Sequence, residues 1–134
     1  MNMVYLTKEY KFCAAHKYWN SSWSNKKNKE VFGSDAKVHG HNYTLEVMVT
    51  GEINLETGFL VDLSHLKNIV KTHVIDIIDH SQIEKEVDWF QGKQPSTENL
   101  VQFIWEQIDS RLEGAKLHRI RLRETPTIFT DYYG

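Results

Sequence analysis

The sequence has few of the features that mark several large classes of protein. Its 134 residues include one cysteine, Cys13, and only two prolines. A single cysteine excludes an internal disulfide framework and fits a reducing compartment. No apolar run is long enough to span a bilayer, and the N-terminus has no basic and then apolar leader. We therefore expect a cytoplasmic protein without a membrane partner.

An excess of charge of one sign is also missing, since 16 Lys and Arg residues stand against 18 Asp and Glu residues. Such a balance gives no indication of a surface for nucleic acid or anionic lipid. A chain of this length is large enough for one core, yet small enough that a cleft can need a neighbouring subunit. We expect a single domain spanning residues 1–134.

Histidine, by contrast, is abundant: the chain has seven, two of them in His39-Gly40-His41. In an extended segment these two imidazoles point to the same side, because side chains alternate along a strand. Tyr43, Leu45 and further alternate apolar residues continue the parity of His41, which predicts a strand over residues 39–53 with one buried face. Two imidazoles on a stiff strand suit zinc. Without a third ligand, such a pair is more typical of packing or hydrogen bonding.

Hydrophobic periodicity along the rest of the chain predicts a simple order of elements. Alternation predicts strands over residues 4–16, 117–124 and 128–133, and helical spacing predicts helices over residues 63–78 and from about 96 to Gly114. Asp62 is the expected cap of the first helix, and Ser96 or Thr97 that of the second. Residues 17–37 form a long polar connection, typical of a functional or disordered segment. This order favours an α+β fold with one antiparallel sheet and two helices on one face.

Two features of this layout have chemical interpretations and ordinary alternatives. Glu124 has the parity of Ile120 and Leu122, so its carboxylate is expected on the apolar face at a strand end. A strand-end residue that bends into solvent fits the pattern about as well. Asp79 and His80 follow the first predicted helix, where they suit a base and its orienting carboxylate. On pattern alone, a capping and turn pair is the more common arrangement.

Longer motifs, in a fixed order, point to a family. They are Phe12-Cys13-Ala14-Ala15-His16, Trp23-Ser24 within residues 20–28, Phe32-Gly33, His39-Gly40-His41-Asn42-Tyr43, Gly58 to Lys67, Asp79-His80, Pro95 to Asn99, and Glu124-Thr125-Pro126 leading to Tyr133-Gly134. Over nearly the whole chain they resemble the 6-pyruvoyltetrahydropterin synthase and 6-carboxytetrahydropterin synthase family. The resemblance implies the tunnelling fold (T-fold), in which ββααββ subunits join their sheets into an oligomeric barrel. It also implies a trimer or a hexamer of two trimers, with zinc-containing, pterin-binding active sites at subunit interfaces.

The same resemblance assigns roles to single residues. It implies that His16, His39 and His41 are zinc ligands, and three protein ligands leave the open position of a catalytic zinc. This supplies the third ligand that the two histidines of one strand lack. It also implies that Glu124 anchors the pterin ring, because a carboxylate can accept N–H bonds from the 2-amino and N3 positions together.

Four further residues match family positions near the substrate. Thr97 and Glu98 match a segment that lines the pterin pocket, although Ser96 stands where threonine is common. Asp79 and His80 match a proton-relay pair. The resemblance therefore implies roles for all four in binding the pterin or transferring its protons.

One departure from the family pattern bears on the reaction. The family has a cysteine after Phe-Gly that acts as general base on the substrate side chain, whereas Phe32-Gly33-Ser34-Asp35 places Asp35 there. An ordinary aspartate has a pKa near 3.9, against about 8.5 for cysteine, so Asp35 suits a hydroxyl proton better than a carbon-bound one. A branch of the family with glutamate in this place is associated with cleavage of the dihydroneopterin side chain. Cys13 is no obvious substitute, because it points to the other side of its strand from His16.

Three functions therefore stand. The first is a zinc-dependent lyase acting on 7,8-dihydroneopterin triphosphate, of the 6-carboxy-5,6,7,8-tetrahydropterin synthase or 6-pyruvoyltetrahydropterin synthase type. The second is aldolase-like cleavage of the dihydroneopterin side chain to 6-hydroxymethyl-7,8-dihydropterin. The third is a non-catalytic pterin-binding or zinc-binding oligomer, against which the Asp79-His80 pair speaks. Depending on the product, the pathway is that of queuosine, folate or tetrahydrobiopterin.

Overall fold

A four-stranded antiparallel sheet is the frame of the protein in the computed structural model, which describes residues 3–134. In spatial order its strands are β1 (Val4–His16), β2 (His39–Gly51), β3 (Lys116–Thr125) and β4 (Ile128–Tyr132). β1 and β2 pair along their whole length, from Val4 opposite Gly51 to His16 opposite His39. This register brings the three histidines of the two strands to one end of the sheet. The predicted second strand ends at Gly51 rather than Ile53.

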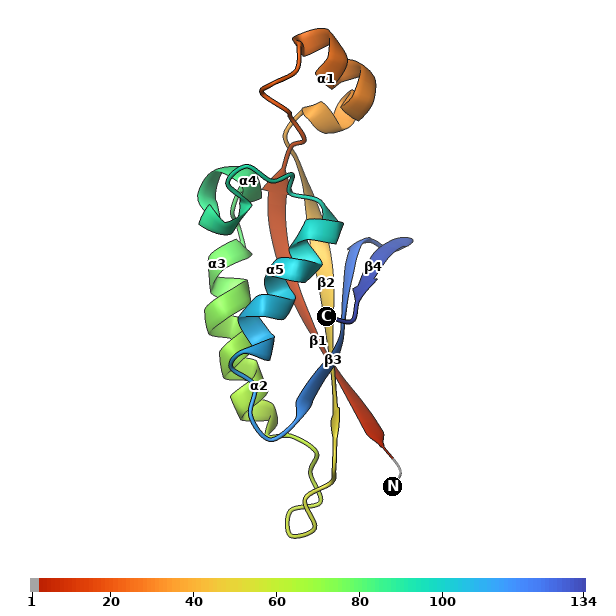
Figure 1. Ribbon diagram of the computed structural model, residues 1–134, viewed down its shortest axis with the longest axis vertical. Helices are drawn as coiled ribbons and strands as arrows, with labels where there is room; N and C mark the ends of the chain where they lie inside the picture. The colour runs from red at the N-terminus through yellow and green to blue at the C-terminus, as the bar shows by residue number, and fades with distance from the viewer. Residues whose placement is uncertain (1–2) are drawn as a thin grey trace.

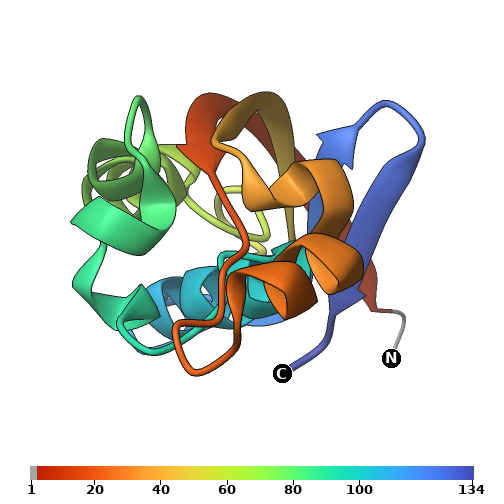
Figure 2. The ribbon, with the colours of Figure 1, turned by 90° about the horizontal axis from the view of Figure 1, so that it is seen from above.

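Two helical segments cover one side of this sheet (Figure 1, Figure 2). The first comprises α2 (Leu63–Val70), a π-turn (Lys71–Ile75) and α3 (Asp76–Ile78), and the second is α5 (Thr97–Asp109). The carboxylate of Asp62 accepts the N–H of Ser64 in α2, and the hydroxyl of Ser96 accepts the N–H of Asn99 in α5. Both helices and both caps were predicted. The second helix was predicted to reach Gly114, but α5 ends at Asp109 and a turn follows at residues 110–111.

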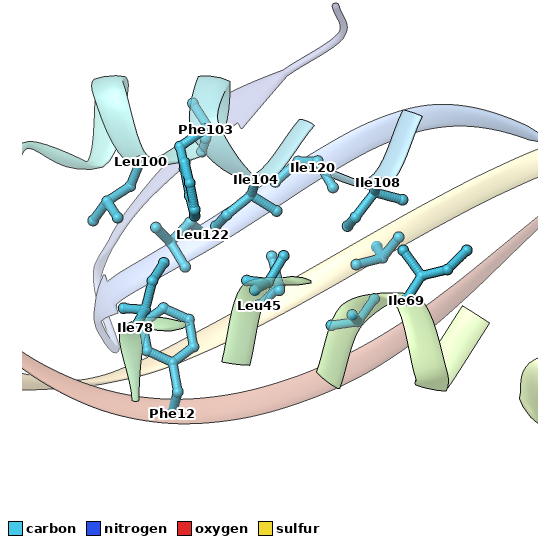
Figure 3. Close-up of a cluster of buried hydrophobic side chains, with 14 of the residues drawn as sticks. Phe12, Leu45, Ile69, Ile78, Leu100, Phe103, Ile104, Ile108, Ile120 and Leu122 are labelled. Atoms are coloured by element: carbon cyan, nitrogen blue, oxygen red, sulfur yellow. The ribbon is translucent and has the colours of Figure 1, made fainter. Parts of the chain in front are cut away.

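The hydrophobic core fills the space between these helices and the sheet (Figure 3). Leu45, Ile120 and Leu122 of the sheet meet Ile104 and Ile108 of α5, and all five side chains are fully buried. Burying one such side chain contributes about 1.5–3 kcal/mol. The predicted alternation is therefore confirmed, and the buried side of the sheet is the side on which His16 lies.

The polar connection over residues 17–37 is folded. It contains α1 (Asn25–Phe32) and a 3-10 turn (Gly33–Ala36), which lie at the histidine end of the sheet (Figure 1). The side chain of Asn28 is fully buried and bonds the backbone of Asn20 and Ser24. Phe32 stacks with the ring of Tyr18 and with that of Trp23. A buried amide and three aromatic rings thus hold a segment whose composition resembles that of a loop.

The segment between the two main helical segments contacts the edge of β1. It contains α4 (Ile83–Glu86) and a 3-10 turn (Asp88–Phe90), neither of which was predicted. Before α4, the N–H of Ala15 donates to the carbonyl of Ser81 at 2.8 Å, and a parallel bridge joins Ala15 to Gln82. These contacts fix Asp79 and His80 against the end of β1.

The side of the sheet opposite the helices is charged. Arg119 and Arg123 both pair with Glu46, and Arg121 binds Asp131 through two hydrogen bonds of 2.7 and 2.9 Å. β1 and β4 are the two edge strands of the sheet. Among residues 3–134, no helix has the length and apolar character needed to cross a membrane.

Candidate metal and substrate site

Three imidazoles meet at the end of β1 and β2. The ring of His16 lies 4.6 Å from that of His39 and 5.1 Å from that of His41, centroid to centroid, and the last two rings are 5.1 Å apart. One nitrogen from each ring lies within 4.8 Å of the others. The antiparallel register produces this cluster, because it sets His16 opposite His39 and Ala14 opposite His41.

Backbone carbonyls orient two of these rings. Nδ1 of His16 lies 2.7 Å from the carbonyl oxygen of Pro95, and Nδ1 of His39 lies 2.7 Å from that of Lys37. A carbonyl only accepts, so each Nδ1 donates a proton and each Nε2 keeps its lone pair. Metal-binding histidines are held in this way, with the second nitrogen bonded to a backbone carbonyl or carboxylate.

The environment of His16 fits a metal ligand. Its side chain is fully buried, and its Nε2 has no hydrogen-bond partner within the described residues. Burial lowers the pKa of His16, although the Pro95 carbonyl acts in the opposite direction, so the neutral form that a metal needs is favoured. An unpaired buried nitrogen is costly. A zinc ion held by His16, His39 and His41 would satisfy it, so the residues present fit the metal.

Glu124 lies beside the cluster. Its Oε1 is 3.4 Å from Nε2 of His16 and 3.3 Å from Nε2 of His41, and its side chain is 16% exposed. The pairing of β3 with β4 is irregular between Arg123 and Thr125, which places Glu124 at a bulge. Bulges re-aim side chains and are frequent beside active sites. The predicted position of Glu124 on the apolar side is confirmed, and bending into solvent is excluded.

Asp35 approaches the cluster from the 3-10 turn after α1. Its Oδ1 lies 3.8 Å from Nε2 of His39, and its side chain is 61% exposed. The backbone carbonyl of Asp35 accepts the N–H of Tyr18 at 2.9 Å, which ties the turn to the residues that follow β1. The carboxylate can thus reach a molecule bound beside the histidines while remaining open to solvent.

Thr97 and Glu98 begin α5, directly after the segment that orients His16. Thr97 is buried, and its hydroxyl lies 2.9 Å from that of Thr130 on β4. The hydroxyl also donates to the carboxylate of Glu98 at 3.2 Å. The pair therefore joins the N-terminus of α5 to the sheet near the cluster, without a direct hydrogen bond to any of the three histidines.

Two tyrosines beside the cluster were not predicted as site residues. The Tyr18 ring lies 5.1 Å from that of His16, and burial together with Glu124, Glu98 and Asp35 raises its pKa well above the usual range. The hydroxyl of Tyr43 is buried without a hydrogen-bond partner within the described residues. The parity of Tyr43 with His41 was a signal for its position, whereas Tyr18 lies beyond the predicted strand.

Asp79 and His80 are not brought to the three histidines within one chain. They instead form a second group with Cys13, in which one ligand atom of each residue lies within 4.8 Å of the others. Nδ1 of His80 is 3.0 Å from the Asp79 carboxylate. Cys13 points to the side of β1 opposite His16, because side chains alternate along a strand.

Comparisons with known proteins agree over almost the whole chain. The family model for 6-pyruvoyl tetrahydropterin synthase matches residues 5–134. A 6-pyruvoyl tetrahydrobiopterin synthase of Drosophila melanogaster is 33% identical over 135 residues, or 98% of this chain and 80% of that protein. The solved structure of Caenorhabditis elegans 6-pyruvoyl tetrahydropterin synthase matches with a TM-score of 0.93 and 31% identity, covering 100% of this chain and 97% of that one.

Two relatives have different names. A 6-carboxy-5,6,7,8-tetrahydropterin synthase of Bacillus subtilis is 30% identical over 111 residues, covering 78% of this chain and 73% of that protein. A dihydroneopterin monophosphate aldolase of Pyrococcus furiosus is 38% identical over 89 residues, covering 66% of this chain and 71% of that protein. The antiparallel sheet with helices on one side is the T-fold of the solved synthases. From its sequence and its fold, the chain belongs to the 6-pyruvoyl tetrahydropterin synthase family, whose homologues are lyases.

Proposed function

We propose that the protein is a zinc-dependent lyase that acts on the side chain of 7,8-dihydroneopterin triphosphate, as a 6-carboxy-5,6,7,8-tetrahydropterin synthase or 6-pyruvoyltetrahydropterin synthase. The buried Nε2 of His16 supports this most directly, because it faces two further imidazoles and lacks a partner of its own. Zinc bound by His16, His39 and His41 would supply a Lewis acid for the substrate side chain. The remaining chemistry falls to the side chains around the cluster.

Glu124 is the proposed anchor of the pterin ring. Its carboxylate is largely shielded from solvent, where charge-assisted hydrogen bonds to the 2-amino and N3–H groups are strong. The ring is proposed to bind beside the histidine cluster, since the same carboxylate is within 3.4 Å of Nε2 of His16 and of His41. Thr97 and Glu98 are the proposed lining of this pocket, at the N-terminus of the adjacent helix α5.

Asp35 is the proposed base for a side-chain hydroxyl. It lies 3.8 Å from His39 and is solvent-accessible, so a proton that it accepts can pass to water. A carboxylate is a weak base for a carbon-bound proton. For this reason the second candidate reaction, cleavage of the side chain to 6-hydroxymethyl-7,8-dihydropterin, is favoured by Asp35. The similarity to a dihydroneopterin monophosphate aldolase adds support for it.

The complete active site is proposed to lie between subunits of a homo-oligomer, either a trimer or a hexamer. Asp79 and His80 are the proposed relay, yet they group with Cys13 on the other side of β1 from His16. A relay in that position can serve the histidine cluster of a neighbouring copy. The edge strands β1 and β4 would join such copies into a barrel, since edge strands present unpaired backbone groups.

Product analysis tests the proposed reaction. The zinc-loaded protein is incubated with 7,8-dihydroneopterin triphosphate and with dihydroneopterin, and the products are identified by mass spectrometry. A carboxy- or pyruvoyl-tetrahydropterin supports the first reaction, and 6-hydroxymethyl-7,8-dihydropterin supports the second. His39→Ala serves as the variant that lacks a proposed ligand, and His73→Ala as a histidine control in the π-turn. Pterin binding without any product would leave only a non-catalytic binding protein.

A further inference from the structure

The thiol of Cys13 and the imidazole of His80 line a hollow that also borders His41 of the histidine cluster. The hollow has a volume of about 430 Å³, and Cys13, Gly40, Asn42 and His80 are among the residues that line it. Cys13 is half-buried on β1, whereas the side chain of His80 is 79% exposed. The proposed zinc site does not use this thiol, and the family motif has its cysteine elsewhere in the chain. The hollow therefore presents a nucleophilic group that still has no role.

The three side chains around the thiol have the geometry of a relay. Asp79 accepts the backbone N–H of Cys13 with Oδ1 at 2.9 Å, and its Oδ2 lies 3.0 Å from Nδ1 of His80. This carboxylate holds the His80 proton on Nδ1, which leaves the lone pair on Nε2. Both ring nitrogens lie 3.7 Å from the sulfur of Cys13, within hydrogen-bonding range for sulfur, and Nε2 is the one with a free lone pair. Thiol, base and orienting carboxylate are the parts of an activated cysteine.

The backbone fixes this arrangement. The N–H of His80 donates to the carbonyl of Cys13 at 2.6 Å, and Ser81 accepts the N–H of Ala15. His80 has φ of 63°, a left-handed conformation that residues other than glycine rarely adopt. Such conformations persist only where the surroundings enforce them, and they cluster at functional sites. The hydrogen bond from the Cys13 backbone also lowers the pKa of Asp79, so the orienting group stays ionised.

We infer that Cys13 is the proton-transferring thiol of a Cys13–His80–Asp79 relay, which serves a pterin held at the histidine cluster of a neighbouring copy of this chain. This inference rests on the proposed function. In the cleavage reaction, Asp35 removes a hydroxyl proton and later releases it to water. As the C–O bond becomes a carbonyl, the adjacent carbon–carbon bond breaks and leaves its electron pair on the carbon attached to the ring, which needs a proton in return. The thiol of Cys13 donates that proton to carbon. Nε2 of His80 then takes a proton from water through its exposed ring and passes it to the thiolate, which returns both groups to their starting forms, so protons balance over one turnover.

Alkylation tests the reactivity of the thiol directly, because Cys13 is the only cysteine of the sequence. The zinc-loaded protein is treated with iodoacetamide, and mass spectrometry follows the modified fraction. We expect bound sepiapterin to slow the modification at least about tenfold. His80→Asn is expected to slow it similarly in the absence of pterin, and asparagine tolerates the left-handed backbone at this position. His73→Ala is the matched control and should react at the wild-type rate.

Turnover separates a catalytic thiol from a structural one. General acid–base groups contribute about 10²–10⁴-fold, so Cys13→Ser should lower kcat at least about 100-fold. Zinc content and sepiapterin affinity should match those of the wild-type protein. A double variant that combines Cys13→Ser with His80→Asn should have a kcat only slightly lower than that of the more impaired single variant. The effects of groups that act as a unit are not additive.

The outcomes distinguish this inference from the proposed function. If the wild-type protein forms product and Cys13→Ser retains kcat within about threefold, the relay is refuted and the proposed function stands. The relay would also be refuted if Cys13 were alkylated at the same rate in three samples: the wild-type protein alone, the wild-type protein with sepiapterin, and His80→Asn. A wild-type protein that forms no product from either dihydroneopterin substrate would overturn both.

Discussion

Replacing Glu124 with glutamine removes one charge and one hydrogen-bond acceptor at the proposed pterin anchor. The carboxylate offers two acceptor oxygens to the ring, whereas an amide offers one oxygen and an NH₂ group. That NH₂ group meets a ring N–H, so two donors face each other in a largely shielded place. An unsatisfied buried donor costs about 1–3 kcal/mol. We therefore expect the Kd for a pterin to rise about 5- to 150-fold.

Titration calorimetry with sepiapterin measures this change, and metal analysis shows whether zinc is retained. Zinc should remain, because three imidazoles are left in place. Glu46→Gln is the matched control: Glu46 is a partly buried carboxylate on the opposite side of the sheet, paired with Arg119. Equal sepiapterin affinity in Glu124→Gln and Glu46→Gln would mean that the ring is anchored elsewhere. Loss of zinc from Glu124→Gln would instead make the carboxylate part of the metal site.

Three other predictions concern the metal, the base and the sheet. His39→Ala and His41→Ala should each lose stoichiometric zinc, and zinc should bind more weakly at acid pH because protons compete for the imidazoles; full zinc content in both variants by metal analysis would contradict the assignment. Asp35→Asn should abolish turnover with zinc and pterin binding intact, while Asp35→Cys should shift products toward tautomerisation, and an active Asp35→Asn would move the role of base to another residue. The Arg121 guanidinium lowers the pKa of Asp131, so this carboxylate contributes stability that is fully present above its unfolded pKa of about 3.9 and is lost as the pH falls through its lower pKa in the folded state. Asp131→Asn should therefore cost about 0.5–1 kcal/mol in urea unfolding at pH 7 and less at pH 3, and an equal cost at both pH values would count against the ion pair.

Alternation along the chain was enough to predict the frame of the site. The bounds of β1 and the common side of His16, His41 and Glu124 follow from the two-residue period of a strand. That period depends only on local sequence, so it can be recognised in one amino-acid sequence without knowledge of the fold. The meeting of His16 with His39 depends in addition on the antiparallel register, which the predicted sheet also favoured.

Other parts of the site could not be predicted from local pattern. The fold of residues 17–37 depends on the buried amide of Asn28, and asparagine in a polar run gives no periodic signal. The position of Tyr18 depends on that fold. Likewise, the contact of Cys13 with His80 joins residues that lie far apart in the chain through the edge of β1. Such meetings are set by three-dimensional packing, which residue spacing does not encode.

The π-turn at Lys71–Ile75 controls the phase of the helix that leads to Asp79. Leu66, Val70, Val74 and Ile78 are all fully buried and recur every fourth residue. In a regular α-helix each such step turns the side chain about 40° further around the axis, so the fourth would leave the sheet. The wider π-turn takes up part of this drift. Deleting one residue from it would rotate everything that follows by about 100° and shorten the path by about 1.5 Å. The direction in which the Asp79 carboxylate points therefore depends on the number of residues in the π-turn as well as on their identity.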